Sequence, residues 1–148
     1  MLLFAHLIVG AVLGLKIQSI WLIILLSIFL HFAMDVIPHS HYTVENLQKK
    51  VNNKSGGDFA KVLADMFLGL VVCFFLIWHS ANLWQALLGM LFSILPDSLT
   101  FIYWQTKTPL LEWLYNFHVA IHRKKEPPFL KGLTGQILTV IIAIIIFF

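Results

Sequence analysis

Two pairs of side chains in this 148-residue chain have the type and spacing to hold a metal ion. His31 and Asp35 lie four positions apart near the end of a long apolar stretch, and His118 and His122 repeat that spacing later in the chain. On an α-helix, residues four positions apart lie on one face, a turn apart. A neutral imidazole and a carboxylate placed in this way offer two ligands to one divalent cation.

The composition describes a protein whose surface mostly does not face water. Hydrophobic residues make up 59% of the chain and charged residues 11%, and the mean hydropathy is +0.87. Soluble domains are about 45–50% apolar. Because the apolar runs are continuous and do not alternate, they favour helices over a membrane barrel. The sequence therefore predicts an all-α membrane protein that forms a single domain over residues 1–148.

Polar residues, glycines and prolines divide the chain into helices. Apolar runs predict helices over residues 2–15, 19–37, 58–79, 83–104 and 129–148, and the polar loop between the second and third runs contains a short helix around 44–51. Residues 109–122 are too short and too polar to span a bilayer, which predicts an amphipathic helix at the interface. In total we expect about four transmembrane helices, the first of them short, plus this one interfacial amphipathic helix.

Glycine and proline add two local expectations. Gly10 and Gly14 form a small-xxx-small pair, which lets another helix approach the first apolar run closely. Pro38 ends the second run, because proline disfavours the helical conformation of the residue before it.

The distribution of lysine and arginine predicts the orientation in the membrane. All basic residues except Lys16 lie in or near the loop 39–57, at Lys107, or in the turn 123–131. Basic residues favour the cytoplasmic side. This places the N-terminus in the cytoplasm and the C-terminus outside. The net charge of +3 fits contact with anionic lipids, so the expected partners are membrane lipids and not nucleic acids.

This orientation brings several metal-capable side chains to one depth, although it was derived from lysine and arginine alone. They lie within about two turns, or roughly 10 Å, of the cytoplasmic helix ends. The predicted metal ligands are His6, His31, Asp35, Asp65, Asp97, His118 and His122, with His39 at the edge of the layer. Three carboxylates at one depth repel one another unless cations lie between them. A hydrogen bond between helices or a buried ion pair is the structural alternative for His31 and Asp35.

The ligand set also indicates the metal and the chemistry. Carboxylates and imidazoles suit a divalent transition metal, zinc first and manganese or iron as alternatives, in a site for one or two ions. Two ions can clamp the attacking and leaving oxygens of a phosphoester and supply hydroxide near neutral pH. Asp35 and Asp97 are the predicted catalytic residues, since an aspartate that is not needed as a ligand can act as general base.

The order of the motifs along the chain adds a resemblance. It runs from Ala5-His6 with Gly10 and Gly14, through His31-x-x-x-Asp35-x-x-Pro38-His39, Asp65 and Leu95-Pro96-Asp97, to His118-x-x-x-His122. This order, over most of the chain, resembles the predicted membrane-bound metal-dependent hydrolases, small multipass bacterial proteins related to the LexA-regulated inner-membrane hydrolases. The resemblance implies hydrolysis at a metal centre in a prokaryotic cell membrane. The His-Arg-Gly-x-Thr-His-Ser motif of the more familiar members is absent from this chain.

The position of the predicted site suggests a substrate. A site at the cytoplasmic interface, near Arg123-Lys124-Lys125, suits a lipid with an anionic head group, such as a phospholipid or a polyprenyl phosphate. We therefore expect a hydrolase that acts on a lipid phosphoester. The alternative is a non-catalytic metal-binding membrane protein, either a transporter or a sensor, and a metal-free structural polar cluster is a third reading. Transport requires polar residues through the whole membrane depth, whereas the outer half of this chain is almost wholly apolar.

Overall fold

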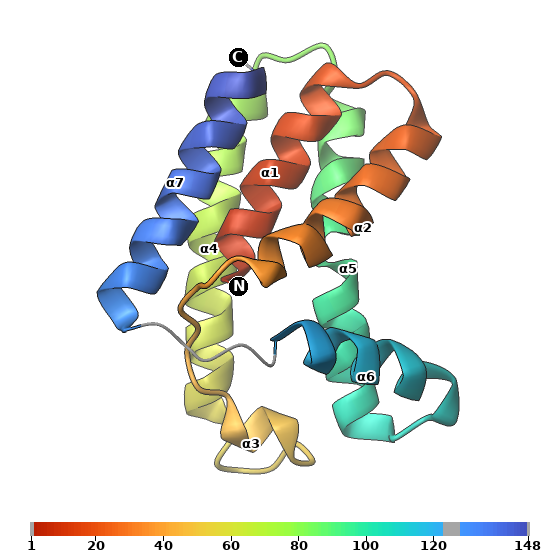
Figure 1. Cartoon of the computed structure of the whole chain (residues 1–148), viewed down its shortest axis with the longest axis vertical. Helices are drawn as coiled ribbons and strands as arrows, with labels where there is room; N and C mark the ends of the chain where they lie inside the picture. Colours follow the sequence, from red (N-terminus) through yellow and green to blue (C-terminus); the bar gives the residue numbers. More distant parts are fainter. Residues whose placement is uncertain (1, 123–127, 148) are drawn as a thin grey trace.

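The computed structural model describes residues 2–122 and 128–147, which form helices joined by loops (Figure 1). These residues contain no strand, and their helices are α1 (Leu3–Lys16), α2 (Ile20–Val36), α3 (Glu45–Gln48), α4 (Gly56–Ile77), α5 (Leu83–Thr106), α6 (Pro109–His122) and α7 (Phe129–Phe147). The predicted all-α class is confirmed, and each of the six longer helices begins and ends within two residues of its predicted range. The predicted basic turn, Arg123–Lys125, lies outside the described residues.

The five longest apolar helices run alternately along one axis. Figure 1 shows α1, α4 and α7 pointing one way and α2 and α5 pointing the other, while α6 lies across the end of α5. Within the described residues, α4 and α5 are the two helices long and apolar enough to cross a membrane, and α1, α2 and residues 130–145 of α7 are shorter apolar helices.

The outward faces of this bundle are apolar. Large hydrophobic side chains are more than half exposed on α2, α4, α5 and α7, among them Trp21, Leu25, Phe29, Phe67, Phe75, Trp84, Leu91 and Ile145. Water-soluble monomers rarely expose apolar faces of this extent.

The short first helix forms the core of the bundle. It packs against α2, α4, α5 and α7 (Figure 1), and every residue from Ala5 to Leu15 is buried. Its 14 residues extend about 21 Å, whereas α4 and α5 have 22 and 24 residues. Both of these helices continue past the N-terminus of α1 (Figure 1). The length of α1 therefore decides how far the packed core reaches between α4 and α5.

Glycines set the distance between α1 and α5. A Cβ atom on Gly14 would collide with the backbone of Gln85, and one on Gly10 would collide with the backbone of Gly89. A Cβ atom on Gly89 would in turn collide with the carbonyl of Gly10. The two backbones therefore touch, which confirms the close approach predicted for the Gly10 and Gly14 pair.

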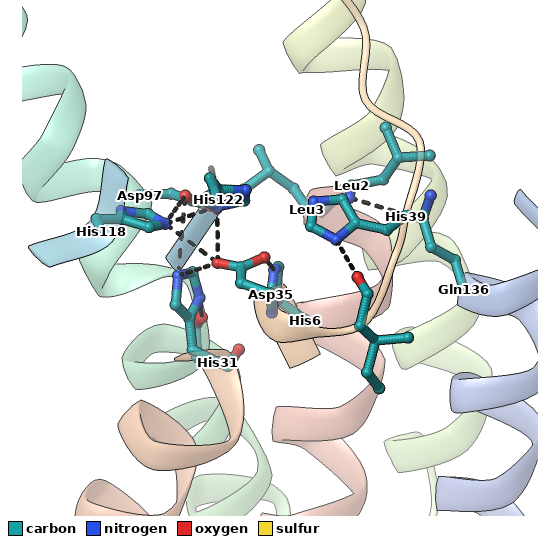
Figure 2. Close-up of polar contacts among 12 residues, drawn as sticks. Leu2, Leu3, His6, His31, Asp35, His39, Asp97, His118, His122 and Gln136 are labelled. Atoms are coloured by element: carbon teal, nitrogen blue, oxygen red, sulfur yellow. Dashed lines mark hydrogen bonds and ion pairs between the residues drawn. The ribbon is translucent and has the colours of Figure 1, made fainter. Parts of the chain in front are cut away.

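The N-terminus of α1 is held by side chains from two other helices. Asp65 on α4 accepts hydrogen bonds from the backbone N–H groups of Leu3 and Phe4, at 2.6 Å and 3.4 Å. Gln136 on α7 is fully buried and accepts one from the N–H of Leu2 at 3.0 Å (Figure 2). These acceptors satisfy N–H groups that a helix leaves unpaired at its start, and a carboxylate there also interacts favourably with the helix dipole. They fix the position of the first turn of α1.

The contact between α1 and α5 predicts a large effect of side chains at Gly14. A Gly14→Leu variant should lose about 3 kcal/mol of unfolding free energy, because its side chain meets backbone that cannot move aside. Gly57→Ala is the matched control, since a Cβ atom at Gly57 has no atom within 4 Å. That variant should gain up to about 1 kcal/mol from helix propensity. Unfolding in detergent followed by circular dichroism measures both, and equal stabilities would contradict the packing described.

Candidate metal centre

Asp35 lies at the centre of a cluster of histidines (Figure 2). Its side chain is completely buried, and Oδ2 lies 3.1 Å from Nε2 of both His118 and His122. The same oxygen lies 3.2 Å from Nε2 of His31, and Oδ1 lies 3.5 Å from Nε2 of His6. Four imidazoles from α1, α2 and α6 therefore surround one carboxylate.

Asp97 and His39 extend this cluster. Oδ1 of Asp97, on α5, lies 3.6 Å from Nε2 of His118 and 3.9 Å from Nε2 of His31. The ring of His39, in the segment after α2, lies 5.1 Å from the ring of His122. Three overlapping groups of these residues have their potential ligand atoms within 4.8 Å of one another. The groups are His6/His31/Asp97, His31/Asp35/His118 and Asp35/His39/His122. The structure thus brings together every predicted ligand except Asp65.

Asp65 lies at the N-terminus of α1 and does not join these groups. Besides the N–H groups of α1, its carboxylate accepts a hydrogen bond from the Tyr42 hydroxyl at 3.2 Å. Burial and the neighbouring Asp65 charge raise the pKa of Tyr42, which keeps this hydroxyl protonated as a donor. The predicted depth of Asp65 says nothing about the direction in which its side chain points. The structure gives it a role in holding α1 in place of the predicted ligand role.

Backbone carbonyls fix the orientation of two of the histidines. Nδ1 of His31 lies 2.7 Å from the carbonyl oxygen of Ser93, and Nδ1 of His39 lies 2.7 Å from that of Ile37. A carbonyl only accepts, so each Nδ1 carries the hydrogen and donates it, which leaves the lone pair of a neutral ring on Nε2. Burial lowers the pKa of His39 to about 4, so its ring is neutral near pH 7. Metal-ligating histidines are held in this way.

Ser93 and Thr100 belong to the site although neither was predicted from the sequence. Ser93 contributes only its backbone carbonyl. Pro96, three residues later, could have indicated a free carbonyl here, because proline lacks an N–H and interrupts the helical hydrogen bonds nearby. Thr100 Oγ1 lies 2.9 Å from Nδ1 of His118. It follows Asp97 by three positions, so helical spacing could have placed the two on one face.

Buried ring nitrogens of the cluster leave part of their hydrogen-bonding capacity unused. Nε2 of His31 and both ring nitrogens of His6 have no hydrogen-bond partner among the described residues. Both side chains are buried, and a buried polar atom without a partner costs about 1–3 kcal/mol. A single proton satisfies one contact between a ring nitrogen and a carboxylate, whereas a metal cation satisfies several at once. The donor set therefore fits a metal ion.

The distances within the cluster also suit coordination. Oδ2 of Asp35 and the Nε2 atoms of His118 and His122 are each 3.1 Å from the other two. Ligand atoms bound to tetrahedral zinc at about 2.0–2.1 Å lie about 3.3 Å from one another. These three atoms thus resemble one face of a coordination tetrahedron. His6, His31 and Asp97 form another group beside Asp35, so the residues present could hold one ion or two.

Comparisons with models of protein families, with curated proteins and with solved structures found no match for this chain.

The different positions of Asp35 and Asp65 predict different effects of the same substitution. Asp35→Asn should weaken zinc binding by about 100-fold or more, because it removes a charged ligand shared by the histidines. Asp65→Asn should leave zinc binding unchanged and lower the free energy of unfolding by about 1 kcal/mol, as loss of a helix cap does. Zinc titration of both variants against a fluorescent chelator measures this. Equal loss of zinc in the two variants would contradict the separation of the two carboxylates.

Proposed function

We propose that this chain is a membrane-embedded metal-dependent hydrolase that acts on a phosphoester of a lipid. The observation that carries the proposal is the group of carboxylates and imidazoles around Asp35, in which ring nitrogens of His6 and His31 lack hydrogen-bond partners and a metal ion would supply one. The order of its motifs, which resembles that of the predicted membrane-bound metal-dependent hydrolases, supports the same reaction class.

The helix lengths and outer surface support placement in a membrane. At 1.5 Å per residue, α4 and α5 extend about 33 Å and 36 Å, and a bilayer core is about 30 Å thick. Trp21, Trp78 and Trp84 are more than 60% exposed. They lie within two residues of the start of α2, the end of α4 and the start of α5, and these three helix ends are at the opposite end of the bundle from α6 (Figure 1). Exposed tryptophans at one level are typical of a membrane interface.

The amphipathic helix α6 supports an interface at the other end. It buries His118 toward the site and exposes Leu110, Trp113 and Phe117, which recur at helical spacing. With α6 at the cytoplasmic surface, the five apolar helices α1, α2, α4, α5 and α7 would each cross the membrane, one more than the four expected from the sequence, and α6 is the interfacial helix. The N-terminus then lies in the cytoplasm and the C-terminus outside, in a prokaryotic inner membrane.

The two aspartates are proposed to do different work. Asp35 has no exposed side-chain surface, whereas 28% of the Asp97 side chain is exposed, and Asp97 lines a large cavity together with His118 and His122. Asp35 therefore suits a ligand that holds the histidines together. Asp97 can reach a substrate and accept a proton, as a general base must.

Bound zinc, or manganese or iron in its place, would lower the pKa of a coordinated water and polarise a phosphoryl oxygen. The protein's own contribution is to fix the imidazoles through Ser93, Ile37 and Thr100. Ligands held in one geometry before substrate binds reduce the reorganisation that the reaction requires.

Phosphate release tests this proposal. Purified protein supplied with zinc should release phosphate from at least one member of a panel of lipid phosphates that includes phosphatidic acid and a polyprenyl phosphate. An Asp35→Ala/Asp97→Ala variant should lose about 1,000-fold or more of this activity, since it lacks both carboxylates.

Two results would contradict the proposal in different ways. Less than one transition-metal equivalent per chain after metal supplementation, measured by elemental analysis, would remove the basis of the enzyme. Full metal occupancy without phosphate release would favour a metal-binding transporter or sensor.

A further inference from the structure

The cavity beside the metal centre occupies the space where α1 stops. It has a volume of about 730 Å³, within the range of about 300–1,000 Å³ that ligand sites occupy. Residues of α3, α4, α5 and α6 line it, and Leu3, the first residue of α1, lies in its wall. Farther along, α1 fills the space between α4 and α5 (Figure 1). The cavity therefore continues the line of α1 between the two longest helices.

The chemistry of the wall changes across this cavity. One part carries Asp97, His118 and His122 from the metal centre, and most of the remainder is apolar. Its apolar lining comes largely from α4 and α5, namely from Phe59, Val62, Met66, Ile94 and Phe101. A molecule that matches this wall has a polar or anionic group at one end and a hydrocarbon chain next to it.

Two of the apolar side chains that line the cavity are also well exposed, one on α4 and one on α5. They are Leu63 and Ile102, which are 55% and 44% exposed. Phe67, one turn after Leu63, is 68% exposed on the same helix. The opening thus has apolar side chains at its rim, next to surfaces that suit hydrocarbon. A lipid can enter there without moving its chain through water.

We infer that the space between α4 and α5 is a lateral entry site that takes the hydrocarbon chain of a membrane lipid while its phosphate-bearing end reaches the metal centre. This inference rests on the proposed function for the identity of the head group. The apolar wall is an independent feature, because it lies on helices that contribute only Asp97 to the metal cluster. The short length of α1 creates the site.

Photocrosslinking tests the inference without requiring catalysis. The probe is phosphatidic acid with a diazirine in one acyl chain, mixed into phosphatidylcholine vesicles that contain the full chain. After photolysis, peptide mass spectrometry should find adducts on the cavity-lining residues of α4 and α5, in the regions 59–66 and 94–102. A Val62→Trp variant should lose these adducts by about fivefold or more, since the indole fills the half-buried site.

Phe67→Trp is the matched control, because it places the same side chain on the exposed face of α4. Its cavity adducts should equal those of the wild type. Zinc content and gel filtration check that Val62→Trp folds, and Val62→Phe replaces it if it does not. Two results would overturn the inference. One is adducts confined to the outer face of α4, and the other is a Val62→Trp variant whose cavity adducts equal those of the wild type.

Hydrolysis separates this inference from the proposed function. Val62→Trp should raise KM for a long-chain lipid phosphate at least about fivefold and leave KM for a soluble short-chain phosphoester unchanged. An equal effect on both substrates would overturn the chain-binding site while the hydrolase stands. Absence of hydrolysis in the wild type, together with cavity adducts, would overturn the hydrolase and leave the lipid site in place.

Discussion

The buried carboxylate of Asp35 is the interaction on which the rest of the site depends. Burying a charged group is unfavourable unless it is paired, and the described partners of Asp35 are four imidazoles within 3.5 Å. Of these rings, His31 has Nδ1 fixed as donor to the Ser93 carbonyl, so Nε2 of the neutral ring presents a lone pair to that carboxylate. A metal ion bound between such groups would satisfy both, and its binding free energy would contribute to folding of the three helices that carry these candidate ligands.

The helix α1 connects this constraint to the architecture. Its glycines let it touch α5 backbone to backbone, and Asp65 and Gln136 hold its first turn. Together these contacts set the position of His6, about one turn into the helix. The same helix is too short to fill the space between α4 and α5. The helix α1 thus positions His6 as a candidate metal ligand and leaves a cavity beside the cluster.

Much of this arrangement follows from the sequence, for reasons that can be named. Continuous apolar runs determine the helices, and helical spacing puts His31 with Asp35 and His118 with His122 on shared faces. The distribution of lysine and arginine orders the helices by direction, which brings ligands from separate segments to one depth. That reasoning carries no information about rotation around a helix axis. The sequence therefore predicts Asp65 at the level of the cluster, whereas in the structure its carboxylate points toward the start of α1.

Helical spacing and charge distribution do not predict contacts that backbone groups make, or contacts between residues far apart in the chain. The carbonyl of Ser93 carries no side-chain signal, and Gln136 meets Leu2 across 134 positions of the chain. The cavity depends on a difference in length between packed helices, which no local pattern encodes. The burial of α1 is not encoded locally either. An apolar helix can face lipid or protein, and the helices packed around it determine which.

X-ray absorption at the zinc edge tests the central claim, that Asp35 and the histidines around it form a metal centre. The protein loaded with one equivalent of zinc should show nitrogen and oxygen ligands at about 2.0–2.1 Å, with outer-shell scattering from at least two imidazoles and no sulfur ligand. Asp35→Asn should change this spectrum and Asp65→Asn should not. A shell of water oxygens without imidazole scattering, or a spectrum unaffected by Asp35→Asn, would contradict the account.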